Sequence, residues 1–186
     1  LIAKQSFIRQ AASPILPPVR WEKITIVGVG LLGGSLGLAI KHRRLAAHVE
    51  GYARRAVTLT ECRKLKALDR ATLDLPEAVT DADLVILCTP LAQMRLLVEQ
   101  MLPALKRGAI VTDVGSVKGS VVKELESLVA KAGGHFVGSH PMAGAEKTGI
   151  SAARADLFEG AMCVVTPTRR TNQAALRKVE QFWKSV

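Results

Sequence analysis

A glycine-rich segment at residues 28–37 places the strongest constraint on how this chain can fold. It reads GVGLLGGSLG and contains the pattern G-x-G-x-x-G at Gly28, Gly30 and Gly33. A β-branched run precedes it, and an apolar segment that ends in KHRR follows it. A strand, a glycine turn and a helix in this order are typical of a dinucleotide-binding domain.

Each glycine of the pattern has its own expected role. The first permits a tight turn, the second lets a pyrophosphate approach the backbone, and the third lets helix and strand pack closely. The start of the helix offers free N–H groups and a partial positive charge to the phosphates. We therefore expect the cofactor to contact the backbone at Gly28, Gly30, Leu31, Leu32 and Gly33.

The rest of the chain alternates between strand-like and helix-like segments. The expected strands are residues 24–29, 48–53, 71–73, 84–88, 109–112, 135–137 and 161–165. The expected helices are residues 35–44, 58–68, 90–106, 117–132 and 172–184. This order predicts an α/β fold with a doubly wound, mostly parallel sheet of the Rossmann type. Hydrophobic residues make up 48% and aromatic residues 4% of the chain, which suits the aliphatic core of a parallel sheet.

The chain divides into two unequal parts. Residues 1–20 contain no acidic residue and three prolines, so we expect a loosely ordered extension over 1–22 and the dinucleotide-binding domain over 23–186. The sequence stops directly after the last expected helix. A dinucleotide-binding domain usually needs a second domain to close over the nicotinamide, so we expect this chain to be one part of a larger enzyme.

The composition argues against several other classes of protein. The net charge is +10, but the basic residues are scattered in pairs without interleaved aromatics, which disfavours nucleic acid as a partner. The three cysteines are far apart and lack metal-ligand spacing, which favours a reducing, cytoplasmic compartment and no metal site. Residues 24–40 are uncharged and contain G-x-x-x-G spacings, but their glycines cluster as a turn requires, so we expect no membrane span.

Two further loops are expected to meet the cofactor. After the second strand, where an NAD site would carry an acidic residue, the chain has Ala53, Arg54 and Arg55. A guanidinium group suits a 2′-phosphate, so NADP is predicted over NAD, unless these arginines only begin a solvated helix. At the end of the most apolar strand, Thr89 either meets the cofactor or caps the helix that Pro90 opens.

Candidate catalytic residues follow the expected strands at 109–112 and 135–137. Ser116 precedes an amphipathic helix and is either its N-cap or a hydrogen-bonding partner of the substrate. Lys118 lies in the first turn, where the helix dipole disfavours a cation, which indicates an anion nearby. His140 heads the glycine-rich loop 138–149, where it is well placed as a general base. His42, His48 and His135 lie on expected helices or strands and look structural.

Three motifs, taken together, resemble one known family. They are GVGLLGGS at 28–35, TDVGSVK at 112–118 and GSHPMAG at 138–144 followed by Glu146. In this order they are similar to the prephenate/arogenate dehydrogenases of tyrosine biosynthesis, from about Lys23 to the end of the chain. The resemblance implies that His140 accepts the hydroxyl proton of the substrate and that Ser116 orients both His140 and this hydroxyl. It also implies an acidic residue, Glu146, at the pocket mouth, and a substrate or structural contact for Lys118.

The resemblance further implies a reaction. Hydride leaves the carbinol carbon of a cyclohexadienol, prephenate or arogenate, for NAD or NADP, and the ring loses carbon dioxide as it becomes aromatic. A helical C-terminal domain, absent from this chain, would form a homodimer. Family members often carry an acid where this chain has Ala53. Two alternatives stay open: an NADP-dependent enzyme of the β-hydroxyacid dehydrogenase or imine reductase type, and a non-catalytic dinucleotide-sensing module.

Overall fold

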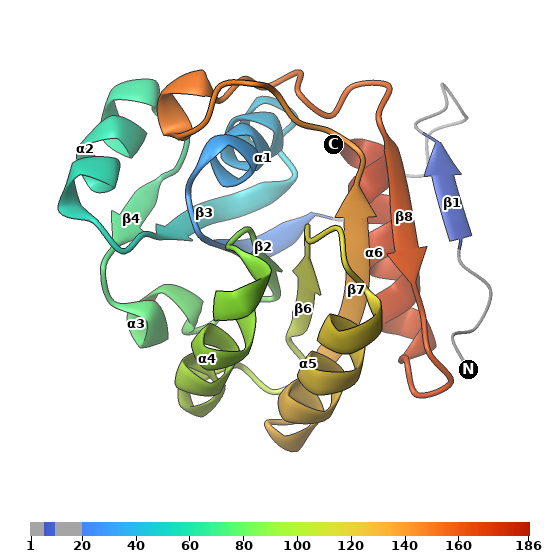
Figure 1. Cartoon of the computed structure of the whole chain (residues 1–186). Coiled ribbons are helices and arrows are strands. Elements are labelled where there is room, and N and C mark those ends of the chain that lie inside the picture. The colour runs from blue at the N-terminus through green and yellow to red at the C-terminus, as the bar shows by residue number, and fades with distance from the viewer. Residues whose placement is uncertain (1–5, 10–19) are drawn as a thin grey trace.

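The protein folds around one eight-stranded sheet (Figure 1). The structure is a computed structural model, and it describes residues 6–9 and 20–186. The strand order is β1-β8-β7-β6-β5-β2-β3-β4. All neighbours from β7 to β4 are parallel, whereas β8 pairs antiparallel with both β7 and β1. The predicted doubly wound, mostly parallel fold is confirmed. The strands are β1 Ser6–Arg9, β2 Trp21–Val27, β3 Ala46–Tyr52, β4 Arg70–Thr72, β5 Leu84–Leu87, β6 Ile110–Asp113, β7 His135–Pro141 and β8 Met162–Thr166.

Helices cover both faces of this sheet and form two separate cores. One core joins side chains of α1, α2 and α6 to the sheet, and the other joins those of α3, α4 and α5. Successive residues of β5 alternate between them: Ile86 belongs to the first core, and Val85 and Leu87 to the second. The helices are α1 Leu31–His42, α2 Ala56–Leu65, α3 Leu75–Val79, α4 Leu91–Met101, α5 Gly119–Lys131 and α6 Gln173–Ser185, with short 3₁₀ turns η1 Leu102–Ala104 and η2 Ile150–Ala152.

The uncharged segment at 24–40 is a strand, a turn and a helix rather than one continuous span. β2 ends at Val27, and α1 begins at Leu31. In the part of the chain that the structure describes, no helix combines the length and the apolar character needed to cross a bilayer.

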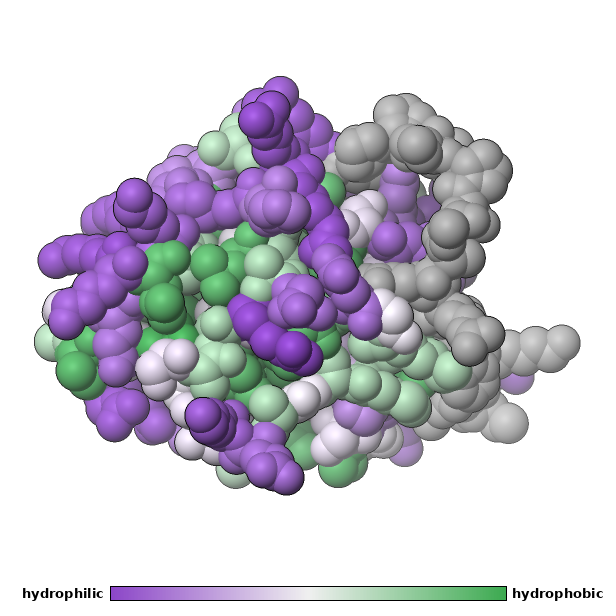
Figure 2. Space-filling view, turned by 90° about the horizontal axis from the view of Figure 1, so that it is seen from above, coloured by the Kyte–Doolittle hydropathy of each residue, from purple (hydrophilic) through white to green (hydrophobic). Residues whose placement is uncertain are grey.

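The carboxyl ends of the parallel strands meet at one edge of the sheet. Val27 pairs with Leu87, Leu87 pairs with Asp113, and Thr112 pairs with Val137. The loops that follow β2, β5, β6 and β7 therefore share this edge, and the arrows of β6 and β7 point upward toward it in Figure 1. Figure 2 shows the molecule from above, where apolar residues occupy much of the middle of the view and hydrophilic side chains lie around and among them. An open α/β sheet binds its ligands at the carboxyl ends of its strands.

Several elements differ from the expected ones, and for β7 the cause is a long-range contact. The strand expected at 135–137 is β7 and reaches Pro141, since β8 pairs with it from Gly138 onward. The helix expected from Val117 begins at Gly119. Helix α3 was not expected, although Asp74 caps it by accepting a hydrogen bond from the backbone N–H of Glu77 at 2.9 Å.

Two described parts of residues 1–22, where a loose extension was expected, belong to strands of the sheet. Ser6–Arg9 forms β1 at the edge of the sheet, and Trp21 and Glu22 are already the first residues of β2. An added strand on an exposed edge satisfies backbone groups of β8 that no local pattern reveals. The remainder of the extension, 1–5 and 10–19, lies outside the described residues.

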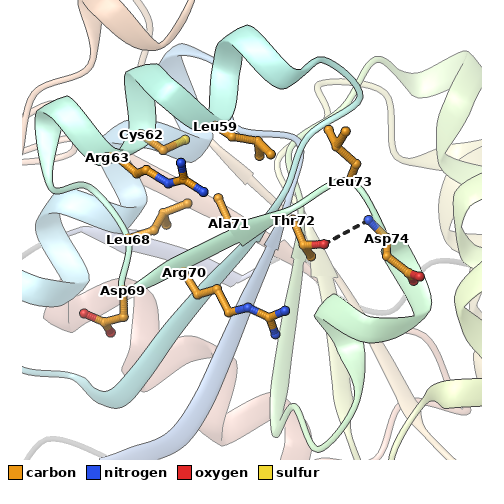
Figure 3. A pocket seen from close by; sticks show the side chains of 10 residues that line it. All are labelled: Leu59, Cys62, Arg63, Leu68, Asp69, Arg70, Ala71, Thr72, Leu73 and Asp74. Atoms are coloured by element: carbon orange, nitrogen blue, oxygen red, sulfur yellow. Dashed lines mark hydrogen bonds between the residues drawn. The ribbon is translucent and has the colours of Figure 1, made fainter.

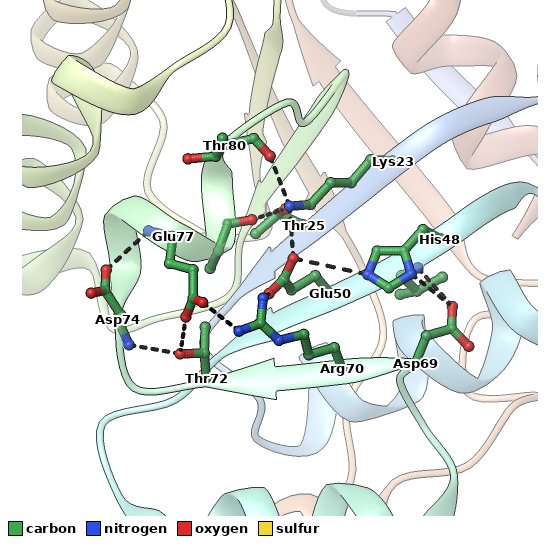
Figure 4. A network of polar contacts seen from close by, with 12 residues as sticks. Lys23, Thr25, His48, Glu50, Asp69, Arg70, Thr72, Asp74, Glu77 and Thr80 are labelled. Carbon is green, nitrogen blue, oxygen red and sulfur yellow. Dashed lines mark hydrogen bonds and ion pairs between the residues drawn. The ribbon is translucent and has the colours of Figure 1, made fainter.

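A polar network fastens the far edge of the sheet (Figure 4). At its centre is the carboxylate of Glu50 on β3, which is 2% exposed and contacts Lys23 at 2.6 Å and Arg70 at 3.1 Å. Arg70 also pairs with Glu77 of α3, and Lys23 donates to the carbonyl of Thr80 at 2.7 Å. A buried carboxylate is stable only when it is paired in this way. The network thereby holds β2, β3, β4 and α3 together.

Candidate active site

The glycine turn between β2 and α1 has the geometry that its pattern predicts. Gly28 has φ of +98°, which L-residues rarely adopt, and its N–H donates to the carbonyl of Tyr52 at 2.9 Å. A Cβ on Gly33 would lie 2.2 Å from the carbonyl oxygen of Gly28, so α1 packs directly against the turn. A Cβ on Gly30 would meet nothing within 4 Å. Gly28 is therefore required for the turn and Gly33 for the close packing, whereas the space beside Gly30 is open to a ligand.

The start of α1 fits the phosphates of a dinucleotide. Gly30 is its N-cap and forms no side-chain capping bond, and the first turn carries no acidic residue. The first N–H groups of a helix have no partner within the helix, so its positive end here is left for an anion.

Thr89 lies directly against the glycine turn. A Cβ on Gly28 would come within 2.6 Å of the Thr89 Cγ2 atom. The N-cap of α4 is Pro90 with no side-chain capping bond, so the interpretation of Thr89 as a helix cap is wrong. Its buried hydroxyl oxygen has no hydrogen-bond partner among the described residues. A buried, unpaired hydroxyl is costly, which favours the other role, contact with a bound cofactor.

Arg54 and Arg55 follow β3 at the same edge of the sheet. Both are exposed, Arg55 is the N-cap of α2, and neither forms an ion pair with a residue in the described ranges. Ala53 beside them is buried and offers no carboxylate. Two unpaired guanidinium groups are thus available where the ribose of a dinucleotide would lie.

The loop after β6 carries Ser116 and Lys118, and it differs from the expectation. Ser116 is exposed and does not cap α5, because the helix begins at Gly119 with Lys118 as its N-cap. The side chain of Lys118 pairs with the carboxylate of Asp113 and donates to the carbonyl of Ser139 at 2.7 Å. An anion was expected near Lys118 because a cation is unfavourable at the start of a helix, and Asp113 is such an anion.

His140 lies within β7 rather than in a loop, opposite Val164 of β8. Its side chain is partly exposed at the carboxyl edge of the sheet. Partial burial and the nearby charge of Lys118 lower the pKa of His140 below its ordinary value of 6.5, although Asp113 acts in the opposite direction. The imidazole is therefore neutral at physiological pH, the state in which it can accept a proton.

The segment from β7 to β8 crosses the top of the molecule to reach α1 and α2 before it returns (Figure 1). Glu146 lies in its exposed first part. Further along, Ile150 is buried, and the N–H of Arg154 donates to the hydroxyl of Ser35 at 3.0 Å. The segment that carries Glu146 is thus anchored on the helix that follows the glycine turn.

A separate cavity of about 660 Å³ lies between α2 and β4 (Figure 3). It is lined by Leu59, Cys62, Arg63, Leu68, Asp69, Arg70, Ala71, Thr72, Leu73 and Asp74, none of them a predicted site residue. Within the described ranges, no group of three or more His, Cys, Asp or Glu residues could hold a metal ion.

Comparison with known proteins decides the family. Residues 36–186 match the family described as "Prephenate dehydrogenase, nucleotide-binding domain". The chain belongs to the prephenate dehydrogenase family. Among curated members, the cyclohexadienyl dehydrogenase of Zymomonas mobilis is 35% identical over 167 residues, which are 89% of this chain and 56% of that protein.

Solved structures of the prephenate dehydrogenase family agree with this assignment. The prephenate dehydrogenase of Aquifex aeolicus, in complex with hydroxyphenyl propionate and NAD⁺, has a TM-score of 0.80 and 31% identity, covering 88% of this chain and 57% of that one. The arogenate dehydrogenase of Synechocystis has a TM-score of 0.78 and 34% identity, covering 86% and 55%. The chain spans about half the length of the relatives that it matches, and its match is to their nucleotide-binding domain.

The candidate site of this prephenate dehydrogenase domain therefore falls into two groups along one edge. The glycine turn contacts Thr89, and the Asp113 and Lys118 pair links the Ser116 loop to the residue before His140. Sequence reasoning did not include Asp113 or Ser139. The signal that was present is the polar strand end Thr112-Asp113 followed by a lysine in a helix start.

Proposed function

We propose that this chain is the cofactor-binding part of a dehydrogenase that oxidises and decarboxylates prephenate or arogenate. The observation that carries the proposal is that a histidine with a lowered pKa lies at the same carboxyl edge as the glycine turn. β2 and β7 are separated by β5 and β6, so the two sites are about 14 Å apart across the sheet. An extended dinucleotide that starts at α1 would run toward His140.

The predicted site residues divide the work of this mechanism between them. The start of α1 binds the phosphates, and Thr89 and Pro90 line the path of the dinucleotide. When bound, the nicotinamide supplies the hydride acceptor. The neutral imidazole of His140 accepts the proton of the substrate hydroxyl, which makes loss of hydride from the same carbon easier. Ser116 orients the hydroxyl, and Glu146 stands at the mouth of the pocket. Lys118 has a structural role, since Asp113 and Ser139 occupy its ammonium group.

Activity should depend on pH through His140. Because the protonated imidazole cannot act as a base, kcat/KM should rise about tenfold per pH unit on the acid side and then become constant. The lowered pKa of His140 places the midpoint below 6.5. The measurement is a pH–rate profile of the full-length protein with prephenate. A midpoint clearly above 6.5 would contradict a lowered pKa.

We also propose that NADP is preferred over NAD. Exchange of Arg54 or Arg55 for alanine should weaken NADP binding by about 10- to 100-fold, since each change removes a charged hydrogen bond to the 2′-phosphate. NAD binding should hardly change. Arg63→Ala, at the other end of the same helix, is the matched control, because it removes the same charge from an exposed position. Calorimetric titration with both cofactors tests this, and equal losses for NAD and NADP would reject it.

The proposed reaction is tested by assaying the full-length protein with both substrates and both cofactors, following the absorbance of the reduced cofactor. Turnover of prephenate or arogenate is the expected result. Oxidation of a β-hydroxyacid in place of both would favour the alternative enzyme class, and cofactor binding without any oxidation would favour a sensing module.

We propose further that the full-length protein is a homodimer through a helical domain outside this chain. We also propose that it works in the cytoplasm, where its three free cysteines would stay reduced.

A further inference from the structure

Ser139, the residue directly before His140, is held at every polar atom. It is fully buried in β7. Its N–H donates to Asp113 Oδ1 at 3.1 Å, its carbonyl accepts from Lys118 Nζ at 2.7 Å, and its hydroxyl donates to the Asp113 carbonyl at 2.6 Å. The Ser139 hydroxyl also accepts from Trp183 Nε1 at 3.0 Å. The backbone that leads into His140 therefore has little freedom to shift.

The carboxylate of Asp113 joins this backbone to the loop after β6. While Oδ1 accepts from Ser139, Oδ2 accepts from the N–H of Gly115 at 2.9 Å. Gly115 directly precedes Ser116, and Ser139 directly precedes His140. One buried side chain, with no exposed surface, thus holds the residues next to both members of the proposed Ser116 and His140 pair.

Three titratable groups lie near His140: Asp113, Lys118 and Cys163. Burial raises the pKa of Asp113 and lowers that of Lys118, while their direct contact favours the charged form of each. Cys163 of β8 is the third titratable neighbour. Burial raises its pKa to about 12, so it is a neutral thiol. Lys118 is therefore the cation that disfavours a protonated imidazole.

We propose that Asp113 is a positioning residue, whose carboxylate sets the spacing of Ser116 and His140 and keeps the charge of Lys118 beside the imidazole. The proposal rests on the proposed function for its catalytic meaning, but the geometry itself is independent of the substrate. A buried carboxylate that only stabilised the fold would need partners, but not partners adjacent to both site residues.

The first test is the double variant Asp113→Asn/Lys118→Met in the full-length protein. It removes both buried charges together, so neither is left unpaired. We expect unchanged cofactor binding and a kcat lower by about 10- to 100-fold, because small displacements of reacting groups cost this much. A kcat equal to that of the unmodified protein would overturn the proposal. Asp113→Asn alone should lose at least as much, since it leaves the Lys118 charge unpaired.

The second test follows the imidazole itself by NMR titration, with the His140 signal assigned by its loss in His140→Asn. In Lys118→Met, the midpoint of His140 should rise by about one pH unit, because the neighbouring positive charge is gone. Lys123→Met, an exposed lysine of the same helix, is the control and should leave it unchanged. A His140 curve that does not move in Lys118→Met would overturn the proposal. This measurement does not depend on turnover. If the protein oxidised neither substrate, the proposed function would be wrong, but the His140 titration would still test this inference.

Discussion

Exchange of His140 for asparagine should lower kcat by about 1,000-fold, within the range that a general base contributes. Asparagine can keep a hydrogen bond to the substrate hydroxyl but cannot take its proton. Cofactor affinity should stay nearly constant, because His140 lies near the end of β7 whereas the dinucleotide phosphates would bind at the start of α1. Steady-state assays and cofactor titration of the full-length variant give the two quantities.

The control for this variant is His42→Asn. His42 is an exposed residue at the end of α1 and should be replaceable without effect on turnover. Near-normal turnover in His140→Asn would remove His140 from the base role and favour the enzyme classes that use a different catalytic residue.

The second large effect separates two glycines of one motif. Gly33→Ala should destabilise the domain by about 3 kcal/mol, because its Cβ would lie 2.2 Å from a backbone oxygen that cannot move away cheaply. Gly30→Ala should cost much less stability, since its Cβ meets nothing within 4 Å and its φ of −100° is negative. That same methyl group would occupy the space beside the start of α1 and should weaken cofactor binding at least tenfold.

Thermal unfolding and cofactor titration of the two variants test this contrast. Gly108→Ala is unsuited as a control, because its φ of +78° would add strain of its own. Gly119→Ala at the start of α5 is better matched: its Cβ also meets nothing within 4 Å, and it lies away from the glycine turn. If Gly30→Ala bound the cofactor as tightly as the unmodified domain, the phosphate site would have to lie elsewhere.

The parts of the fold that could be predicted are those with strong local signals. The buried run Leu84–Leu87 is short and apolar, with Asp83 before it and Thr89-Pro90 just beyond Cys88, so its assignment as a buried strand needed no other information. The glycine turn is equally local, because the positive φ of Gly28 and the backbone oxygen beside Gly33 each require glycine at one position. These features also carry the cofactor half of the candidate site.

The parts that could not be predicted depend on partners far along the chain. His140 was expected in a loop, and it lies in a strand because β8 pairs with it more than twenty residues later. Helix capping was one of the two roles expected for Ser116, and it is wrong because α5 begins only at Gly119. The role of Asp113 depends on Ser139, 26 residues away, and no pattern within one segment contains both.

The two adjacent glycines of α1 have a mechanical consequence. Gly33 faces the β2 turn, and a Cβ on Gly34 would lie 2.9 Å from both Ala153 and Ile150 of the segment that returns to β8. The first turn of this helix is thus packed tightly against the turn after β2 and against the segment between β7 and β8, which leaves α1 little room to shift relative to either. A larger side chain at Gly33 or Gly34 would therefore displace a neighbouring element and not only the helix itself.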